Sequence, residues 1–294
     1  MSNTMLFAVW NRPEMFALVT ESLVEAYNYY QFPDLKFVFA VEAPNDPKVL
    51  ELIKTFPFPV EVVLVRNQHF GLSRNILEAM KVAMEKTDDY VFFQADDIVV
   101  HKTFFKFYHT LIEEYKDKFS VHSLATYTEG GNINKVNIGH AYDAAGACIS
   151  KEFWTDYVAK CSDESFYSHR SYFVNRLDEM FKEYFPRPYK FKVGQGKHNQ
   201  QAGLINRLVD VALIKEGYNS TTVDVARVRN VGFYGRNRPG SGLTGETFED
   251  RIKNLREIIT DRDRIYAHTA TKQYSDYVNF DEHLDDWDGS IILK

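Results

Sequence analysis

The segment Tyr90–Val100, YVFFQADDIVV, decides the fold and places the candidate site. Its first four residues are apolar or aromatic, as in a strand buried on both faces of a parallel sheet. Asp96 and Asp97 follow at the end of this strand. Open α/β sheets bind their ligands outside the carboxyl ends of the strands. The two carboxylates therefore favour a hard divalent cation, and the alternative is that they open a surface loop and cap the next helix.

The residues before this segment alternate between strand and helix patterns. A buried strand is predicted at Met5–Trp10, and further strands at Phe37–Val41 and Val60–Val65. Helices are predicted at Pro13–Tyr29, around Val49–Ile53 and at Leu72–Met84. Strands that alternate with helices through short loops form a parallel sheet with helices on both faces. The loops that follow these strands then share one edge of the sheet. We expect that edge to carry Arg12, Glu42, residues 67–74 and the Asp96–Asp97 pair.

The pattern after Val100 is less regular. It predicts helices at 102–115, at Phe153–Trp154, at 170–184, at 198–215 and at Phe248–Ile259, and strands within 122–127, at 144–150 and at Thr221–Val225. Residues 128–134 are interpreted as a turn-rich loop. Residues 227–245 contain five glycines and four arginines, which indicates a mobile loop. The tail to Lys294 is acidic and weakly patterned.

Composition and charge narrow the class of protein. Hydrophobic residues make up 45% of the chain and charged residues 26%, as in soluble globular proteins. A net charge of −6 argues against broad, nonspecific binding to nucleic acid. The cysteines, Cys148 and Cys161, are so few that they indicate a reducing compartment. We see no transmembrane-length apolar run, and the first apolar run is too short for a signal peptide, so we expect a cytoplasmic protein.

Four motifs and their order carry a resemblance to one family. They are NRPE (11–14), RNQHFGLSRN (66–75), the Asp96–Asp97 pair and RVRNVGFYG (227–235). Together they resemble nucleotide-sugar glycosyltransferases of the GT-A fold, notably the branch of N-acetylglucosaminyltransferase I and its bacterial and phage relatives. The resemblance covers roughly residues 5–240.

The resemblance implies one domain with a Rossmann-like, mostly parallel twisted sheet. Residues 1–100 would form the half that binds the nucleotide sugar. Residues 101–245 would form a mixed half that binds the acceptor, and residues 246–294 a C-terminal helix and acidic tail.

The resemblance also implies roles for residues at the donor. Asp97 would hold a divalent metal, manganese or magnesium, that bridges the two phosphates, and Asp96 would bind the ribose or the sugar. Asn11 and Arg12 would contact the nucleotide; the alternative for Arg12 is a solvated arginine at a helix start. Glu42 matches a position where the family uses an acid to accept a hydrogen bond from uracil. The family often has Asp there, which leaves the base open.

Two further stretches match donor-binding positions of the family. Gly71, Ser73 and Arg74 would lie against the nucleotide, although Ser73 would serve equally as a helix cap, and Asn75 more readily packs or caps. Asn230, followed by Gly232, would contact the metal or pyrophosphate. Four arginines would fold over the phosphates as a basic lid, with a solvated basic loop as the alternative: Arg227, Arg229, Arg236 and Arg238.

The general base is the point at which the sequence departs from the family. Inverting relatives place an acid just before the helix that resembles residues 203–208, but this chain has Ala202 there. Asp143, Glu129 and Asp210 are the candidate catalytic residues, and His198 is a further one. Asp210 lies on a predicted helix and is also explained by a structural role. A retaining mechanism without an enzymic base stays open.

The sequence therefore predicts a metal-dependent glycosyltransferase, a hexosyl- or pentosyltransferase that uses a UDP-sugar. The acceptor hydroxyl would belong to a glycan or to a hydroxymethylated base of phage DNA, in the host cytoplasm. A nucleotidyltransferase would need a glycine-rich basic signature after the first strand, which NRPEMF lacks. A non-catalytic nucleotide-sugar- or glycan-binding protein is the other alternative. The sequence specifies neither the donor sugar nor the oligomeric state.

Overall fold

The protein is described from a computed structural model that covers residues 2–116, 118–124, 131–140, 142–161, 204–232, 243–260, 280 and 282–294. Its first half alternates β1 (Asn3–Val9), α1 (Pro13–Tyr29), β2 (Leu35–Val41), α2 (Pro47–Lys54), β3 (Val60–Val65), α3 (Leu72–Lys86) and β4 (Tyr90–Ala95). Next come β5 (Ile98–Val100), α4 (Phe104–Tyr115), β6 (Val121–Ser123), β7 (Lys135–Gly139), β8 (Cys148–Ser150), α5 (Lys151–Phe153), a π-helical turn (Trp154–Val158) and α6 (Ala159–Cys161). The remaining elements are α9 (Leu204–Glu216), β9 (Ser220–Val223), β10 (Val228–Asn230), α10 (Phe248–Thr260), a 3₁₀ turn (Glu282–Asp286) and β11 (Ile292–Leu293).

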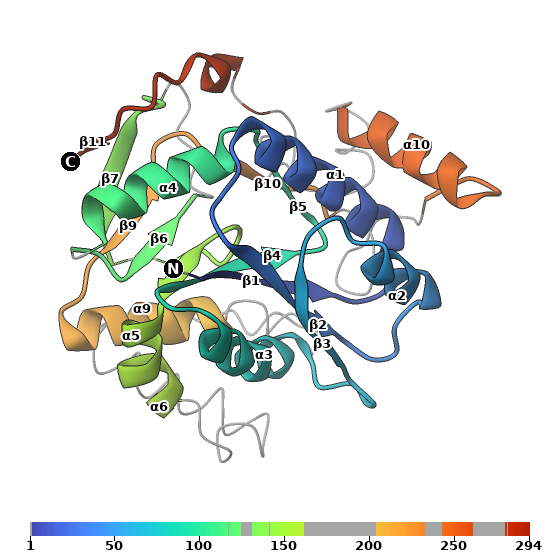
Figure 1. The fold of residues 1–294 in the computed structure, drawn as a ribbon, viewed down its shortest axis with the longest axis horizontal. Helices are drawn as coiled ribbons and strands as arrows, with labels where there is room; N and C mark the ends of the chain where they lie inside the picture. The colour runs from blue at the N-terminus through green and yellow to red at the C-terminus, as the bar shows by residue number, and fades with distance from the viewer. Residues whose placement is uncertain are drawn as a thin grey trace, which may run out of the picture.

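A nine-stranded sheet in the order β11-β7-β9-β6-β8-β4-β1-β2-β3 forms the centre of the molecule (Figure 1). β1 pairs in parallel with both β2 and β4, and β2 pairs in parallel with β3. β8 runs antiparallel to β4 and joins the two halves of the sheet. The predicted mixed α/β fold with a mostly parallel sheet is confirmed. A separate two-stranded ribbon, β5 with β10, lies beyond the carboxyl end of β4.

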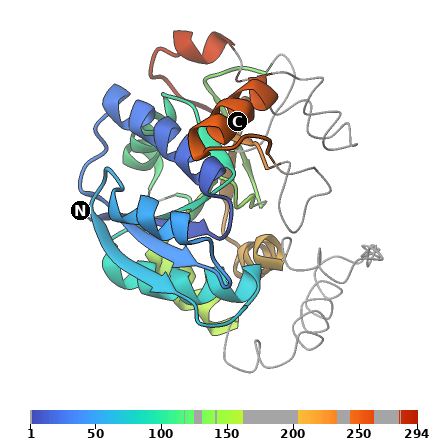
Figure 2. The same ribbon diagram turned by 90° about the vertical axis from the view of Figure 1, so that its right-hand side faces the viewer.

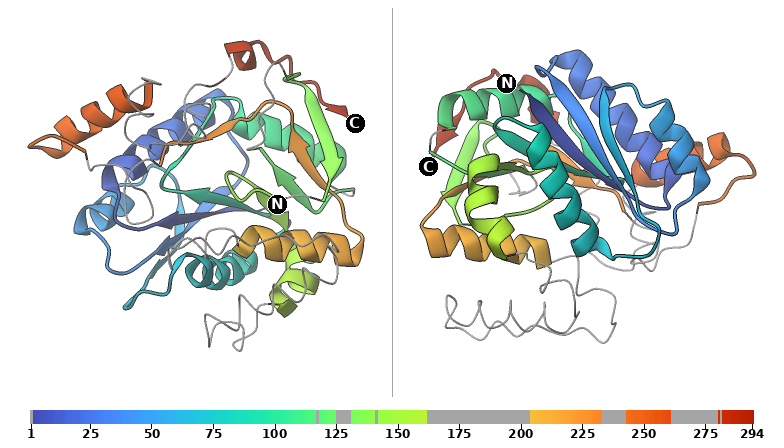
Figure 3. Two further views of the ribbon diagram at one scale, coloured as in Figure 1. Left: turned by 180° about the vertical axis from the view of Figure 1, so that it is seen from behind. Right: turned by 60° about the horizontal axis from the view of Figure 1, so that its bottom comes forward.

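Helices cover both faces of the sheet (Figures 1 and 3). One core cluster joins the sheet to α1, α2 and α4 and is rich in phenylalanine, with Phe7, Phe16 and Phe39 fully buried. The other core cluster joins the opposite face to α3, α9 and the turn after α5. α10 packs beside α1, where Met15 contacts Leu255 in a small cluster of its own (Figure 2). Aromatic residues make up 15% of the chain, and many of them fill the core.

Local sequence explains the helix starts nearest the site. α1 begins at Pro13, whose fixed φ and missing N–H suit the first helical position. α2 begins with Pro47 after Asp46, whose side chain accepts a hydrogen bond from the Lys48 amide. α3 follows Gly71, whose φ of 84° falls in the region that glycine tolerates best.

Some elements differ from the sequence prediction. Residues 98–100 form the separate strand β5. Residues 227–245 were expected to be a mobile loop, but their first part forms β10, because residues 228–230 pair with β5. β7 and β11 were not predicted. α9 is described from Leu204, and residues 198–203, where the sequence predicts its start, lie outside the described residues. The predicted helix at 170–184 lies outside the described residues.

Two further sequence expectations concern the cysteines and the membrane. Cys148 is a buried free thiol, so it takes part in no disulfide. In the part of the chain that the structure describes, no helix has both the length and the apolar character needed to cross a membrane.

Candidate functional site

Three neighbouring strands deliver polar side chains to one edge of the sheet. β1 lies between β2 and β4, and its last residues pair with theirs, Ala8 with Ala95 and Val9 with Val41. The segment after β1 carries Trp10 and Arg12, and the segment after β2 carries Glu42. The segment after β4 carries Asp96 and Asp97. The predicted clustering of Arg12, Glu42 and the aspartate pair at this edge therefore follows from the parallel pairing alone.

Arg12 bridges the two aspartates. Its Nη2 donates a short hydrogen bond to Asp96 Oδ1, and its Nη1 lies 3.0 Å from Asp97 Oδ2. Asp96 Oδ2 also accepts a hydrogen bond from the Trp10 amide at 3.3 Å. Asp96 and Asp97 are both buried, at 3% and 8% exposure, whereas 17% of the Arg12 side chain remains exposed. The aspartate pair is therefore an organised ionic cluster rather than the start of a solvated loop.

The electrostatics of this cluster are those of closely packed charges with little solvent. Burial raises the pKa of Asp96, and Asp97 raises it further, while the Arg12 charge acts in the opposite direction. Burial alone would lower the pKa of Arg12, but the two carboxylates more than offset this and raise it above its ordinary value. The cluster therefore holds two carboxyl groups against one guanidinium. This excess of carboxyl oxygens suits a cation.

The β5–β10 ribbon brings Asn230 and Gly232 to Asp97. Asn230 pairs with Ile98, and the Val231 amide donates to the Asp97 carbonyl at 2.8 Å. The Gly232 amide donates to Asn230 Oδ1 at 2.9 Å. A β-carbon on Gly232 would collide with Asp97 Oδ2 and would lie 3.1 Å from Asn230 Oδ1. The two side-chain oxygens therefore pack closely against Gly232, where a larger residue would not fit.

The side-chain oxygens of Asp97 and Asn230 are of the chemical type that suits a divalent cation such as manganese or magnesium. Carboxylate and amide oxygens are the hard ligands these ions prefer. Within the described residues, no group of three or more His, Cys, Asp or Glu side chains is arranged to hold a metal. A cation beside Asp97 and Asn230 would therefore take its other ligands from water or from a bound diphosphate, as Mg²⁺ commonly does.

Glu42 presents an unsatisfied buried oxygen at the same edge. Its Oε1 accepts hydrogen bonds from the Ala43 amide at 2.9 Å and the Phe70 amide at 3.0 Å. Its Oε2 is buried and has no hydrogen-bond partner among the described residues, and Glu42 as a whole is only 5% exposed. A buried, unpaired carboxylate oxygen is costly. This arrangement therefore indicates a ligand that supplies the missing donor.

An aromatic pair that the sequence did not single out lies beside Glu42. The Trp10 and His69 rings stack with centroids 5.3 Å apart. Trp10 Nε1 donates to the Pro44 carbonyl at 2.7 Å, and His69 Nδ1 lies 3.7 Å from Glu42 Oε1. The signal in the sequence was a tryptophan at a strand end and a histidine within RNQHFG. Neither pattern alone shows that the two rings meet.

The segment around Gly71 packs against the start of α3. Arg74 stacks on the Phe70 ring at 4.3 Å and donates to Glu78 Oε1 at 2.7 Å. Arg66 also lies over the Phe70 ring, at 4.9 Å, and its Nε donates to the Asn75 side chain at 2.8 Å. Asn75 thus packs, in line with the structural interpretation of this residue. Ser73 is buried, at 4% exposure.

Two of the four arginines predicted to form a lid are part of the core. Arg227 and Arg229 are 0% and 1% exposed, so they do not fold over the site from solvent. The Arg227 guanidinium lies 3.6 Å from the centroid of the Phe107 ring and donates to the Ile133 carbonyl at 2.7 Å. Burial lowers the pKa of Arg227 to about 9. Both guanidinium groups are therefore held inside the protein by aromatic rings and backbone carbonyls. The other two predicted lid residues, Arg236 and Arg238, lie outside the described residues.

The candidate bases are placed differently by the structure. β8 runs antiparallel to β4, with Cys148 beside Phe92 and Ala147 bonded to Phe93, so residues 143–147 continue toward the end of β4 that carries the aspartates. Asp143 keeps an exposed surface on this segment. Surrounding protein nevertheless raises its pKa by partial burial, against a hydrogen bond from the Ala145 amide.

Asp210 has a structural contact instead. It lies on α9, and its Oδ1 accepts a hydrogen bond from the Tyr142 amide at 2.7 Å, which fixes the segment that leads to Asp143. Glu129 and His198 lie outside the described residues.

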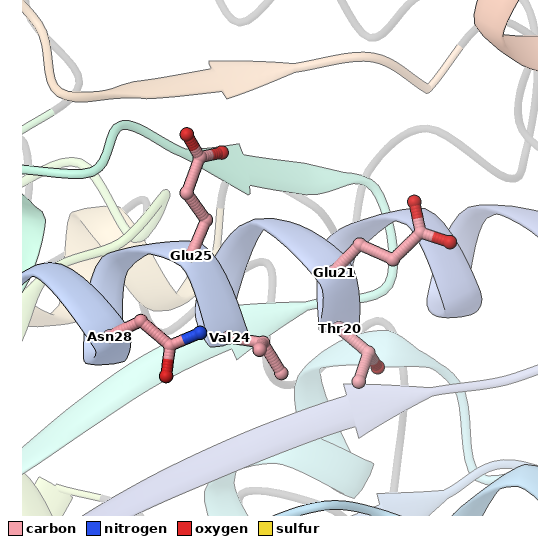
Figure 4. Close-up of a pocket in the computed structure, with 5 residues that line it drawn as sticks. All are labelled: Thr20, Glu21, Val24, Glu25 and Asn28. Carbon is pink, nitrogen blue, oxygen red and sulfur yellow. The ribbon is translucent and has the colours of Figure 1, made fainter.

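A pocket elsewhere on the surface belongs to a single helix. It has a volume of about 390 Å³, and α1 provides its lining residues, Thr20, Glu21, Val24, Glu25 and Asn28 (Figure 4). Glu21 binds Arg256 of α10 at 2.7 Å. This pocket lies along the later turns of α1, whereas Arg12 precedes its first turn, so it is separate from the aspartate cluster.

Comparison with known proteins shows the fold. No family model matches the chain, and no curated protein does. The chain is similar to residues 1–349 of TarS from S. aureus in complex with UDP-GlcNAc, with a TM-score of 0.51, 12% identity, and 94% of this chain and 70% of that chain covered. Two other TarS 1–349 structures align over about half of their length, 49% and 54%. A mannosyltransferase from Pyrobaculum calidifontis, in complex with GDP-Man and Mn²⁺, aligns with a TM-score of 0.41 and 11% identity, over 73% of this chain and 74% of that chain. The chain therefore has the mixed α/β fold of the GT-A glycosyltransferases.

Proposed function

We propose that the chain is a metal-dependent glycosyltransferase that moves a sugar from a UDP-sugar to an acceptor hydroxyl. The observation that carries this proposal is the Arg12–Asp96–Asp97 cluster, joined by Asn230 and Gly232, at the carboxyl edge of a GT-A sheet. The fold match to TarS, a protein crystallised with UDP-GlcNAc, supports the class of donor. The branch of N-acetylglucosaminyltransferase I remains the resemblance drawn from the motifs.

In this proposal the donor diphosphate lies beside Asp97. Asp97 and Asn230 would hold a divalent cation, which would supply positive charge beside the leaving diphosphate. Asp97 would provide the carboxylate ligand, and Gly232 lets this carboxylate pack beside Asn230. Asp96 holds Arg12 and the Trp10 amide, which orients the cluster toward the donor.

Glu42 supports uracil as the base. Only Oε2 of Glu42 lacks a hydrogen-bond partner, so it has room for one donor. Uracil carries one ring N–H, flanked by carbonyl oxygens, whereas the corresponding ring nitrogens of cytosine and adenine are acceptors. Guanine offers two adjacent donors that match both oxygens of a carboxylate, but Oε1 already accepts two amides. The Trp10–His69 pair offers an aromatic surface beside this contact.

Asp143 is the base that we propose for the acceptor hydroxyl, which makes the reaction inverting. Its segment runs toward the aspartate edge, it keeps an exposed surface, and its pKa is raised, as a general base requires. The acceptor is a hydroxyl of a glycan or of a hydroxymethylated base in phage DNA. The net charge of −6 favours the glycan.

The experiment is a thermal-shift panel followed by donor hydrolysis. UDP and UDP-sugars with Mn²⁺ should raise the melting temperature, because a ligand that binds only the folded chain stabilises it. GDP and CDP should raise it less. Slow release of UDP from a UDP-sugar, lost in Asp97→Ala, distinguishes the transferase from a non-catalytic binding protein of the same fold. Absence of any shift with all UDP compounds, with or without Mn²⁺, would sink the proposal.

A further inference from the structure

The Asp97 oxygen that pairs with Arg12 also lies on the side of Gly232 and Asn230. Arg12 Nη1 lies 3.0 Å from Asp97 Oδ2, and Oδ2 is the atom that a β-carbon on Gly232 would strike first. A divalent ion bound to Oδ2 and the guanidinium would meet on one carboxylate oxygen. Two positive groups at such a distance repel each other strongly where the surroundings are shielded from water.

Arg12 has a second anchor that makes an exchange possible. Its Nη2 binds Asp96 Oδ1, a different carboxylate from the one that Nη1 contacts. The Asp96 side chain is 4% exposed and is also held by the Trp10 amide. Arg12 can therefore stay bound to Asp96 while Nη1 leaves Asp97. The Arg12 side chain keeps 17% of its surface exposed.

We infer that Arg12 competes with the divalent cation for Asp97 and that the donor diphosphate relieves this competition, which makes metal and nucleotide bind cooperatively. The inference rests on the proposed function. In the free protein, Arg12 pairs with both aspartates and weakens metal binding. When a diphosphate arrives, Nη1 of Arg12 turns from Asp97 to a phosphate oxygen, and Asp97 Oδ2 becomes available to the metal. Arg12 thus acts as a positioning residue that couples the two ligands.

The coupling between metal binding and nucleotide binding can be measured as the change in Mn²⁺ affinity that UDP causes. Mn²⁺ affinity is measured by electron paramagnetic resonance of free Mn²⁺, without nucleotide and with saturating UDP. The wild-type protein should bind Mn²⁺ at least about 10-fold more tightly with UDP, within the usual range of coupling between two sites. Arg12→Gln should bind Mn²⁺ more tightly than the wild type without UDP, because the competing cation is gone. Its gain on adding UDP should be several-fold smaller.

Further variants keep the test valid if Arg12→Gln does not fold. Arg12→Gln/Asp96→Asn removes one charge of each sign and keeps Asp97, so the formal net charge of the three residues is unchanged. Arg12→Lys keeps a cation but cannot bridge two carboxylates with a planar fork, and it should show intermediate coupling. Arg256→Gln is the matched control, because this arginine binds Glu21 on the surface and its removal should leave coupling unchanged. Circular dichroism confirms that each variant is folded.

The outcomes separate this inference from the proposed function. If the wild type binds neither UDP nor Mn²⁺, both proposals fail. If it binds both ligands, but Arg12→Gln and the double variant bind Mn²⁺ without UDP no better than the wild type, only the competition is overturned. Tighter Mn²⁺ binding by the variants, with reduced coupling to UDP, supports it.

Discussion

Gly232 lies so close to Asp97 that a β-carbon at position 232 would overlap the Asp97 Oδ2 atom. Gly232→Ala should therefore displace the carboxylate and weaken Mn²⁺-dependent UDP binding by at least about 10-fold, since roughly 1.4 kcal/mol is enough for that change. Isothermal titration with UDP and Mn²⁺ measures this. Gly139→Ala is the control, because a β-carbon there meets nothing within 4 Å. Unchanged binding in Gly232→Ala would show that the metal does not use Asp97 Oδ2.

Glu42 should determine the choice of base. In Glu42→Gln, the side-chain oxygen can keep the Ala43 and Phe70 amides, which places the NH₂ group where Oε2 stood. A donor would then face the uracil N–H, so UDP binding should fall by about 1–3 kcal/mol, the cost of an unpaired buried polar group. CDP, which offers an acceptor there, should gain relative to UDP. Competition binding measures the relative affinities of the variant for UDP, CDP and GDP. An unchanged preference for UDP would mean that Glu42 does not contact the base.

The parallel half of the fold was predictable because its signals are local. Apolar runs with helical patterns between them fixed β1 to β4, and the pairing of β1 with β4 then placed Arg12 beside Asp96 and Asp97. The helix at Pro13 and the strand at Val60–Val65 were confirmed for the same reason. No contact between distant segments was needed to find these elements.

The buried arginines show why the second half was less predictable. Arg227 lies within a glycine- and arginine-rich stretch, and its local sequence indicates solvent. Its partners are the Phe107 ring and the Ile133 carbonyl, which approach from distant parts of the chain. β11 likewise joins the sheet beside β7, more than 150 residues away in sequence. Such contacts leave no periodic signal in the segment itself.

Trp287 should be an anchor for the C-terminal segment. It is 4% exposed, its ring lies 5.1 Å from the Phe107 ring, and the Arg227 guanidinium is 5.2 Å from its centroid. Trp287→Ala should lower the free energy of unfolding by about 3–5 kcal/mol, as for other large buried aromatics. Chemical denaturation of wild type and variant measures the loss. Ile292→Ala, at a residue that is 44% exposed, is the control and should cost much less.

His122 should make the fold sensitive to acid. It is fully buried, its Nδ1 contacts Thr221 Oγ1 at 2.7 Å, and burial lowers its pKa from 6.5 to about 3. Between these two pKa values the unfolded chain binds a proton that the folded chain does not. Stability from this group is therefore complete above pH 6.5 and is lost as the pH falls toward 3, by up to about 4 kcal/mol.

The pH dependence of the melting temperature tests whether stability falls, as predicted, when the pH is lowered. The wild type should lose stability as the pH falls below 6.5, and the folded variant His122→Gln should lose less over the same interval. His283→Gln is the matched control, because its side chain is 70% exposed. Equal slopes for the wild type and His122→Gln would mean that His122 is not held neutral by burial.

Substitutions at Asp143 and at Asp210 should have different effects, the first on kcat and the second on stability. Asp143→Asn removes the proposed base and should lower kcat about 10²–10⁴-fold, with UDP binding unchanged. Because burial raises the pKa of Asp143, the wild-type rate should fall on the acid side at a pH above 3.8, and this limb should vanish in the variant. Asp210→Asn weakens the contact with the Tyr142 amide and should reduce stability more than kcat. If Asp143→Asn keeps the full rate and the acid limb, the proton is taken by another group, and the inverting assignment to Asp143 is wrong.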